Sequence, residues 1–379
     1  MKALRFIVIS VAAVGIGVAA GSLRLGCPED GASAPTLHEG DARLRAILDD
    51  GIRLIDEGKP VRGRAALEDA LRIDPRNPQV SRHIAASYRK ELNLKKAMTI
   101  LDQAVESHPR HAGLHLERGM TREAMGEYGE ARADYLVALE ALPDDGQAHL
   151  RLGFAELKLN RFQEALIAGR RALLHEPVDP DVHLLLGTAY AEIGETAAAE
   201  VELRQCLLAR PEHLEARYRL AHLLIRSGKT PEGQRELKRS ARIADHQIEI
   251  GRLEELVRTY YREEFAEDPS HAQLFALSQQ LGREHLGALQ FQKAERVSVK
   301  AAALRPGSAD PLWLSGMAQL GQGRVQAALR TFQQASAADP DAPRFQRAVA
   351  LAEKRIQSGP GRNGSLIELV EDLLGEEPE

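Results

Sequence analysis

Three histidines, His108, His111 and His115, come closest in type and spacing to a chemical site in this chain. His111 and His115 lie four residues apart and would share one face of a helix, a spacing that suits zinc ligands. No glutamate follows them in the pattern of a metalloprotease helix, and no cysteine is near. The alternative interpretation is structural, because His108 directly precedes Pro109 and the other two would open the next helix. We assign no metal site and keep the three histidines as candidates for one.

The rest of the chain offers little to an enzyme mechanism. It contains no nucleophile motif, no phosphate-binding glycine loop and no dinucleotide-binding fingerprint. We therefore expect no catalytic residue and no cofactor, and a protein that is not an enzyme. Its 50 basic and 55 acidic residues are interspersed and give a net charge of −5. Because there is no basic block and no aromatic platform, nucleic acid is not an expected partner.

The strongest pattern in the chain is a repeat of 34 residues that ends in a proline. The prolines are Pro75, Pro109, Pro143, Pro177 and Pro211, and the spacing returns at Pro306 and Pro340. Small residues lie five positions before them, at Ala70, Ala104, Ala138, Ala172, Cys206, Ala301 and Ala335. Within each unit the apolar residues follow a helical period in two segments. A unit is therefore predicted to be a pair of amphipathic helices, and stacked pairs form an α-solenoid.

Two positions of the unit predict how its helices meet and turn. Gly153 lies where the first helix should approach a neighbouring helix closely, and most other units have glycine or alanine there. Seven residues later comes the turn between the two helices. It holds Gly58, Gly126, Asn160, Gly194, Gly228 and Gly323, residues that tolerate the left-handed conformation at a helix end.

The period, the small residues and the closing proline resemble the tetratricopeptide repeat family over most of the chain. The resemblance implies an all-α, right-handed α-solenoid of about eight helix-turn-helix repeats, preceded here by an N-terminal apolar helix. It also implies a scaffold whose first helices line a concave groove for a protein or peptide ligand.

Ligand-contacting positions of the family, carried over to this chain, predict the residues of the groove. They are Leu48, Ile52, Arg82, Arg89, Leu116, Met120, Leu150, Phe154, Leu157, Leu184, Tyr218, His222, Trp313 and Met317. The lining is mostly apolar, and the two arginines add positive charge, so the expected ligand has an apolar face and an acidic flank. Some family members bind a C-terminal carboxylate with a clamp of lysine and asparagine. The ninth residue of the unit, one of the ligand-contacting positions, is never asparagine here, so this clamp is not expected. Several of the leucines could instead pack against the next unit.

The repeat register predicts four segments. They are a signal peptide or membrane anchor at 1–27, a flexible linker at 28–41, the solenoid at 42–357, and a Gly-rich break with an acidic amphipathic tail at 358–379. Asp245 stands where the sixth unit should have its proline, which predicts an extended helix around 240–268. Residues 343–357 are expected to form a capping helix. For the tail helix at 366–374, capping the last repeat, filling the groove and binding a partner all remain open.

The N-terminal segment carries a targeting pattern. Lys2 and Arg5 precede an apolar run from Phe6 to Gly21. Those 16 residues would reach about 24 Å as a helix, against about 30 Å for a membrane core. A retained anchor, a cleaved signal, lipidation at Cys27 and a buried helix are the alternatives. The first three place the solenoid outside the cytoplasm, anchored and facing the periplasm or exterior, or exported. The Ala-, Arg- and Gly-rich composition suggests a bacterial source.

The expected function is that of a non-enzymatic scaffold or adaptor that is associated with a membrane and binds a partner in its concave groove. The alternative is an accessory repeat subunit of an envelope biogenesis enzyme complex, with a histidine-based metal site around His111.

The targeting pattern makes a prediction about location. A reporter enzyme that is active only after export, fused after Glu379, should be active, because the positive charges precede the apolar run. A matched fusion to a reporter that works only in the cytoplasm should be silent. The reverse result would contradict this topology.

Overall fold

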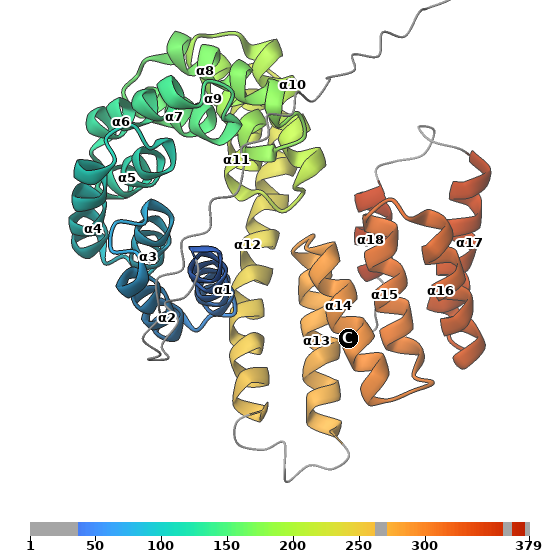
Figure 1. Ribbon diagram of the computed structural model, residues 1–379. Helices are drawn as coiled ribbons and strands as arrows, with labels where there is room; N and C mark the ends of the chain where they lie inside the picture. Colours follow the sequence, from blue (N-terminus) through green and yellow to red (C-terminus); the bar gives the residue numbers. More distant parts are fainter. Residues whose placement is uncertain (1–36, 262–270, 359–365, 376–379) are drawn as a thin grey trace, which may run out of the picture.

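The protein is a curved stack of helix pairs (Figure 1). The computed structural model describes residues 37–261, 271–358 and 366–375. In these ranges the chain forms eighteen α-helices and no strand, which confirms the all-α prediction. The helices are α1 (Leu37–Asp56), α2 (Pro60–Ile73), α3 (Pro78–Lys90), α4 (Leu94–Ser107), α5 (Ala112–Met125), α6 (Tyr128–Ala141), α7 (Gly146–Lys158), α8 (Phe162–His175), α9 (Pro180–Glu192), α10 (Thr196–Ala209), α11 (Leu214–Arg226), α12 (Thr230–Thr259), α13 (Ala272–Gly287), α14 (Phe291–Leu304), α15 (Ala309–Gly321), α16 (Val325–Ala338), α17 (Pro343–Ser358) and α18 (Leu366–Leu374).

The helices pair in chain order, from α1 with α2 to α15 with α16, and α17 and α18 follow. In Figure 1 the pairs from α1 to α11 curve into an arc, with α3, α5, α7 and α9 on its inner side and α4, α6 and α8 outside. The long helix α12 leaves this arc, and α13 to α17 continue the stack beyond it. The first helix of each pair therefore faces the hollow of the arc.

Five first helices, α3, α5, α7, α9 and α11, begin with the same capping contact, two residues after the closing proline. The side chains of Asn77, His111, Asp145, Asp179 and His213 accept a hydrogen bond from a backbone N–H one turn into the helix. Such a cap satisfies one of the backbone N–H groups that have no partner within the helix. The repeat period thus fixes where each first helix starts.

The turns inside the pairs have the predicted left-handed conformation. Gly58, Gly126, Gly194, Gly228 and Gly323 have φ between +77° and +89°, and Asn160 has +59°. The same place in two other units is held by Leu92 and Leu289, with φ of +59° and +60°. The backbone geometry is therefore kept even where the side chain does not favour it.

Gly153 makes the close approach that the sequence predicts. A Cβ atom at Gly153 would lie 2.4 Å from Leu185 Cδ2 on α9, the first helix of the next pair. In other units the corresponding glycine meets a large residue of its own second helix, as Gly119 meets Tyr135. Here the second helix has Gly169 at that place, and Leu185 and Leu186 fill the space between α7, α8 and α9.

The sixth pair departs from the regular unit as its missing proline predicts. Asp245 lies inside α12, which runs without a break for 30 residues. The helix extends from Thr230 to Thr259 and so begins earlier than the expected range of 240–268. Residues 262–268 of that range lie outside the described residues. Apolar residues in its second half, Ile250 and Leu253, form a core with Leu281 of α13. The long helix thus joins the two parts of the stack.

The N-terminal targeting segment, including Cys27, lies outside the described residues. Helix α1 begins at Leu37, within the segment expected to be linker. Among the helices of the described ranges, none has both the length and the apolar character needed to cross a membrane.

The glycine contact makes a prediction about stability. Gly153→Leu should destabilise the protein by about 1–3 kcal/mol, because the new side chain overlaps Leu185. Gly251→Leu is the matched control, since Gly251 also lies inside a helix but has open space around it. The control should leave stability unchanged or raise it by up to about 1 kcal/mol. Thermal unfolding followed by circular dichroism measures both, and equal losses would contradict the packing assignment.

Candidate functional site

A cavity opens on the inner side of the arc beside Phe154. Its volume is about 260 Å³, and its walls come mostly from three consecutive first helices, α7, α9 and α11, with Asn160 in the turn after α7 and Phe162 at the start of α8. The lining consists of Phe154, Leu157, Lys158, Asn160, Phe162, Thr188, Glu192, Glu215 and Arg219. A site made by successive first helices is a segment of the concave groove of the solenoid.

Phe154 lies between the cavity and the core. It is half-buried, and it packs against two apolar clusters, one of which contains Leu150 and Leu185 and the other Leu184 and Leu220. The ring therefore joins neighbouring repeats and also lines the cavity. Thr188, which holds the equivalent position in the next unit, also lines the cavity and is a small polar residue.

Charges of both signs line this cavity. Arg219 donates hydrogen bonds of 2.8 and 3.0 Å to Glu215 one turn before it on α11. Lys158 and Glu192 complete the charged part of the lining. A ligand here would meet an apolar floor and a rim that can pair with acidic as well as basic groups.

The predicted groove residues fall into three classes of exposure. Tyr218 and His222 are exposed, and their rings stack with centroids 4.2 Å apart. The half-buried members are Leu48, Ile52, Arg82, Arg89, Met120, Phe154 and Leu157. The remaining five are buried. The exposed part of the prediction thus lies on α11, and the half-buried part is spread over α1, α3, α5 and α7.

The buried members correct the predicted groove. Leu116, Leu150 and Leu184 are only 5–8% exposed, because the fifth position of the first helix packs into the repeat core. Trp313 and Met317 are fully buried in a cluster with residues of α17 and α18. These five side chains belong to the interior of the protein and are not accessible to a ligand.

The predicted positive flank is also weaker than expected. Arg89 Nε donates a 2.7 Å hydrogen bond to Glu117 Oε1, and Glu117 is buried. A buried carboxylate next to the guanidinium compensates its charge. Arg82 lies one helical turn from the start of α3 and stands beside His83. The sequence shows the two arginines but not the acidic partner, which comes from the next repeat.

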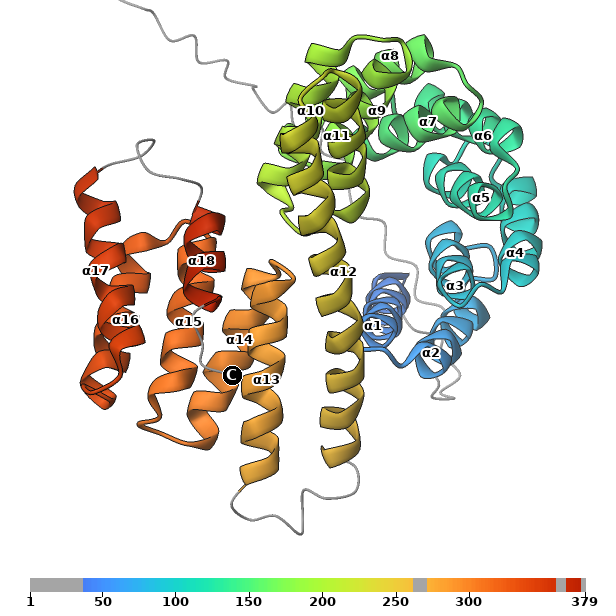
Figure 2. The same ribbon diagram turned by 180° about the vertical axis from the view of Figure 1, so that it is seen from behind.

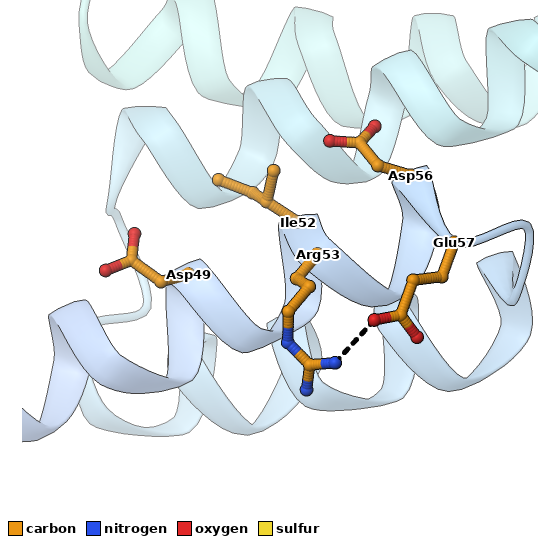
Figure 3. Close-up of a pocket in the computed structure, with 5 residues that line it drawn as sticks. All are labelled: Asp49, Ile52, Arg53, Asp56 and Glu57. Carbon is orange, nitrogen blue, oxygen red and sulfur yellow. Dashed lines mark hydrogen bonds and ion pairs between the residues drawn. The ribbon is translucent and has the colours of Figure 1, made fainter. Parts of the chain in front are cut away.

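A second hollow lies at the N-terminal end of the arc (Figure 3). It measures about 450 Å³ and is lined by Asp49, Ile52, Arg53, Asp56 and Glu57. Arg53 Nη1 donates to Glu57 Oε1 at 2.6 Å, as Figure 3 shows. Four of these residues belong to α1 and Glu57 directly follows its last residue, so this hollow is an open surface along one helix. It does not have the three-helix walls of the cavity at Phe154.

The three candidate metal-binding histidines have separate structural contacts. His111 Nδ1 accepts the backbone N–H of Leu114 at 3.2 Å, and burial lowers the pKa of His111. His115 uses both ring nitrogens, at 2.9 Å from Asp134 Oδ1 and 2.9 Å from the carbonyl oxygen of Pro109. His108 follows α4, and its Nδ1 is buried without a hydrogen-bond partner. In the described ranges no group of three or more His, Cys, Asp or Glu side chains could hold a metal ion.

His115 belongs to a recurring contact that the sequence reasoning missed. Side chains six residues after a closing proline reach back to the carbonyl of that proline, at His115, His149, His183, Arg217 and Gln346. The ring nitrogens of the three histidines lie 2.8–3.3 Å from these oxygens. The sequence could have indicated this contact, because His115, His149 and His183 are spaced by the repeat period of 34 residues.

A buried polar group surrounds Asp134. Its carboxylate, 2% exposed, accepts hydrogen bonds of 2.7 Å from both Arg118 and Arg122 and also contacts His115. Burial alone would raise the pKa of Asp134, but the bonds from His115 and Arg118 hold it below its usual value. The group joins α5 to α6 and has a structural role.

Cys206 occupies a small packing position, as expected. The thiol is fully buried, and burial raises its pKa to about 12. A thiol of that pKa is a poor nucleophile at neutral pH.

Two family models described as tetratricopeptide repeat match the chain. One matches residues 54–117, 190–255 and 285–352, and the other matches 116–181 and 150–205. The chain therefore belongs to the tetratricopeptide repeat family, whose members generally mediate protein–protein interactions.

Similar individual proteins match at low identity or over a short segment. Human "Protein IFIT1 homolog B" is 31% identical over 91 residues, which is 24% of this chain and 19% of that protein. The chain thus spans about a fifth of that relative. A tetratricopeptide repeat protein from Parabacteroides merdae is 14% identical over 82% of this chain and 99% of its own, with a TM-score of 0.43. Pseudomonas aeruginosa pilF is 18% identical over 51% of this chain and 88% of its own, with a TM-score of 0.47.

The Asp134 group makes a prediction about stability. Asp134→Ala should cost about 3 kcal/mol, because it leaves Arg118, Arg122 and His115 without their shared partner. Asp102→Ala is the control, since Asp102 pairs with the same Arg118 at 3.2 Å but is exposed; it should cost less than about 1 kcal/mol. Urea unfolding at pH 7 measures both.

The pH dependence of this contribution has a definite sign. Because the pKa of Asp134 is lowered on folding, its contribution is present above the unfolded value of about 4 and is lost as the pH falls through the folded value. The wild-type protein should therefore lose more stability in acid than Asp134→Ala does. Equal acid sensitivity would contradict this role.

Proposed function

We propose that this protein is a non-enzymatic scaffold or adaptor that binds a peptide or a partner helix in the concave groove at Phe154. The observation that carries the proposal is the cavity of about 260 Å³, which is built by three successive first helices and has an aromatic ring in its wall. Pockets that combine an apolar floor with a few polar groups are typical binding sites.

The lining restricts the ligand. Phe154, Leu157 and Phe162 offer apolar surface, and exposed Tyr218 and His222 follow on α11. Aromatic residues at the centre of an interface often supply most of the binding energy. The rim carries Arg219 and Lys158 beside two glutamates, so a segment with an apolar anchor and mixed charge would fit. The histidines near Pro109 are committed to structural contacts, and we propose no metal role for them.

We also infer that the scaffold works near a membrane surface, outside the cytoplasm. The support is the sequence of residues 1–27, with Lys2 and Arg5 before an apolar run. An anchored or exported solenoid would hold its groove at the membrane for a second protein. The export reporter fusion tests this part independently of the groove.

Phe154→Glu tests the groove. The substitution places a charge in the apolar wall and should weaken partner binding by about thirtyfold, or about 2 kcal/mol. Tyr218→Glu is a second variant whose side chain is 55% exposed, so it should weaken binding without loss of stability. The partner is first captured by crosslinking in cells, and its affinity for each purified variant is then measured by titration.

The control variant is Leu208→Glu on α10, where the leucine is 76% exposed and lies outside the cavity lining. It should bind the partner as the wild type does. Circular dichroism and thermal unfolding show whether each variant is folded. Folded Phe154→Glu and Tyr218→Glu proteins that bind the partner at full strength would overturn the proposal.

A further inference from the structure

The C-terminal helix α18 lies on the first helices of the last pairs. It packs against α15 and also against α13. Figures 1 and 2 show it beside α15. These two helices correspond to α7, α9 and α11 of the arc, which carry the cavity at Phe154. The tail therefore occupies the groove side of the C-terminal repeats, one of the roles that the sequence left open.

The apolar contacts of α18 have the spacing of a helix bound in a groove. Val370 and Leu373 are 0% and 4% exposed, and Leu366 is partly buried in the same cluster. These positions are four and seven residues apart along one face, as in anchored helical peptides. The cluster also contains Trp313 and Met317 of α15. Trp313 also lies next to Phe345 of α17, with ring centroids 6.4 Å apart, so these two predicted groove residues are buried in an interior that α15, α17 and α18 share.

An ion pair holds α18 at its charged edge. Arg239 of α12 donates two hydrogen bonds to Glu371, of 3.0 Å from Nε and 2.7 Å from Nη2. Arg242, one turn later on α12, lies 3.8 Å from the same carboxylate. A bidentate pair of this kind fixes the orientation as well as the position of a helix. The extended helix α12 therefore supplies the positive wall of this second groove.

The helix resembles a tethered ligand more than a member of the stack. It has nine residues, and isolated helices below about 12 residues are marginal in water, so its helical form depends on the surface it contacts. Each regular helix packs against its neighbours in sequence, whereas α18 returns to α15 and α13. On its other face Asp372 is exposed.

We propose that α12, α13 and α15 form a second binding groove that takes an acidic amphipathic helix, that α18 is its intramolecular occupant, and that a partner helix with the same pattern of residues replaces α18. The preferred ligand has large apolar residues at i, i+4 and i+7 and a glutamate beside them, as Leu366, Val370, Leu373 and Glu371 show. This inference is independent of the groove at Phe154.

Because α18 is tethered to the chain, it competes strongly with a free helix for the groove. A short linker gives a tethered segment an effective concentration on the order of millimolar. A free helix must compete with this occupant, so its apparent affinity falls by the fraction of protein whose groove is open. Weakening α18 alone should therefore tighten the binding of an added helix.

The experiment uses the full chain and a labelled synthetic peptide with the sequence of residues 366–379. Fluorescence anisotropy measures its binding to the wild type and to Glu371→Arg, in which the reversed charge would face Arg239 and Arg242. Glu371→Arg should bind the peptide at least about tenfold more tightly than the wild type. Asp372→Arg is the matched control with an exposed side chain, and it should bind as the wild type does.

A second variant tests the charge of the groove. Adding Arg239→Glu to Glu371→Arg should abolish the gain, because residues 239 and 371 then have opposite charges again and α18 returns to the groove. A peptide that itself carries Glu371→Arg should bind this double variant more tightly than the natural peptide does, but no more tightly than the natural peptide binds the wild type, since the tethered helix competes in both.

Three outcomes would overturn the proposal. One is equal or absent peptide binding to the wild type and to a folded Glu371→Arg variant. Another is a dimer, seen by light scattering, that Glu371→Arg dissociates, which would mean that α18 of a second copy fills the groove. If Glu371→Arg does not fold, amide hydrogen exchange of the wild type with excess peptide decides: the amides of α18 should exchange faster, and unchanged rates would refute displacement.

Discussion

The structure depends on one constraint: a single pair of amphipathic helices cannot bury its own apolar face. Each pair therefore needs the next, and the contact between them must be close. At Gly153 this requirement is strongest, because Leu185 of the following pair fills the place where a Cβ atom would be. The curvature of the arc brings α7, α9 and α11 to one side and creates the cavity at Phe154. The binding surface is thus a consequence of how the repeats pack.

The junctions between pairs repeat a small set of polar contacts. A capping side chain starts each of the first helices α3, α5, α7, α9 and α11, and at several junctions a side chain six residues after the proline bonds back to the proline carbonyl. Two of the histidines that the sequence suggested as metal ligands, His111 and His115, make these junction contacts. His111 and His115 serve two different contacts of one junction, and equivalent positions elsewhere hold aspartate, asparagine, arginine or again histidine. Their spacing follows from the positions of these contacts in the repeat.

The sequence predicted the helix pairs, the left-handed turns and the continuous helix at Asp245, because each rests on local residues at a fixed period. It predicted the groove less well, for reasons that involve distant parts of the chain. Glu117, from the next repeat, compensates Arg89, and α18 shares a buried cluster with Trp313 and Met317. Leucine at the position of Leu116, Leu150 and Leu184 would suit either the repeat core or an apolar groove, and in the structure all three are buried. Only three-dimensional packing separates these uses.

The central claim is that the inner row of first helices binds the partner, and site-specific photocrosslinking tests it most directly. A photoreactive residue in place of Tyr218, on α11, would report on the inner side, and one in place of Leu174, on α8, would report on the outer side; the two side chains are 55% and 72% exposed. The account predicts a discrete crosslinked partner from position 218 and none from position 174. The same partner captured from position 174 alone would contradict it.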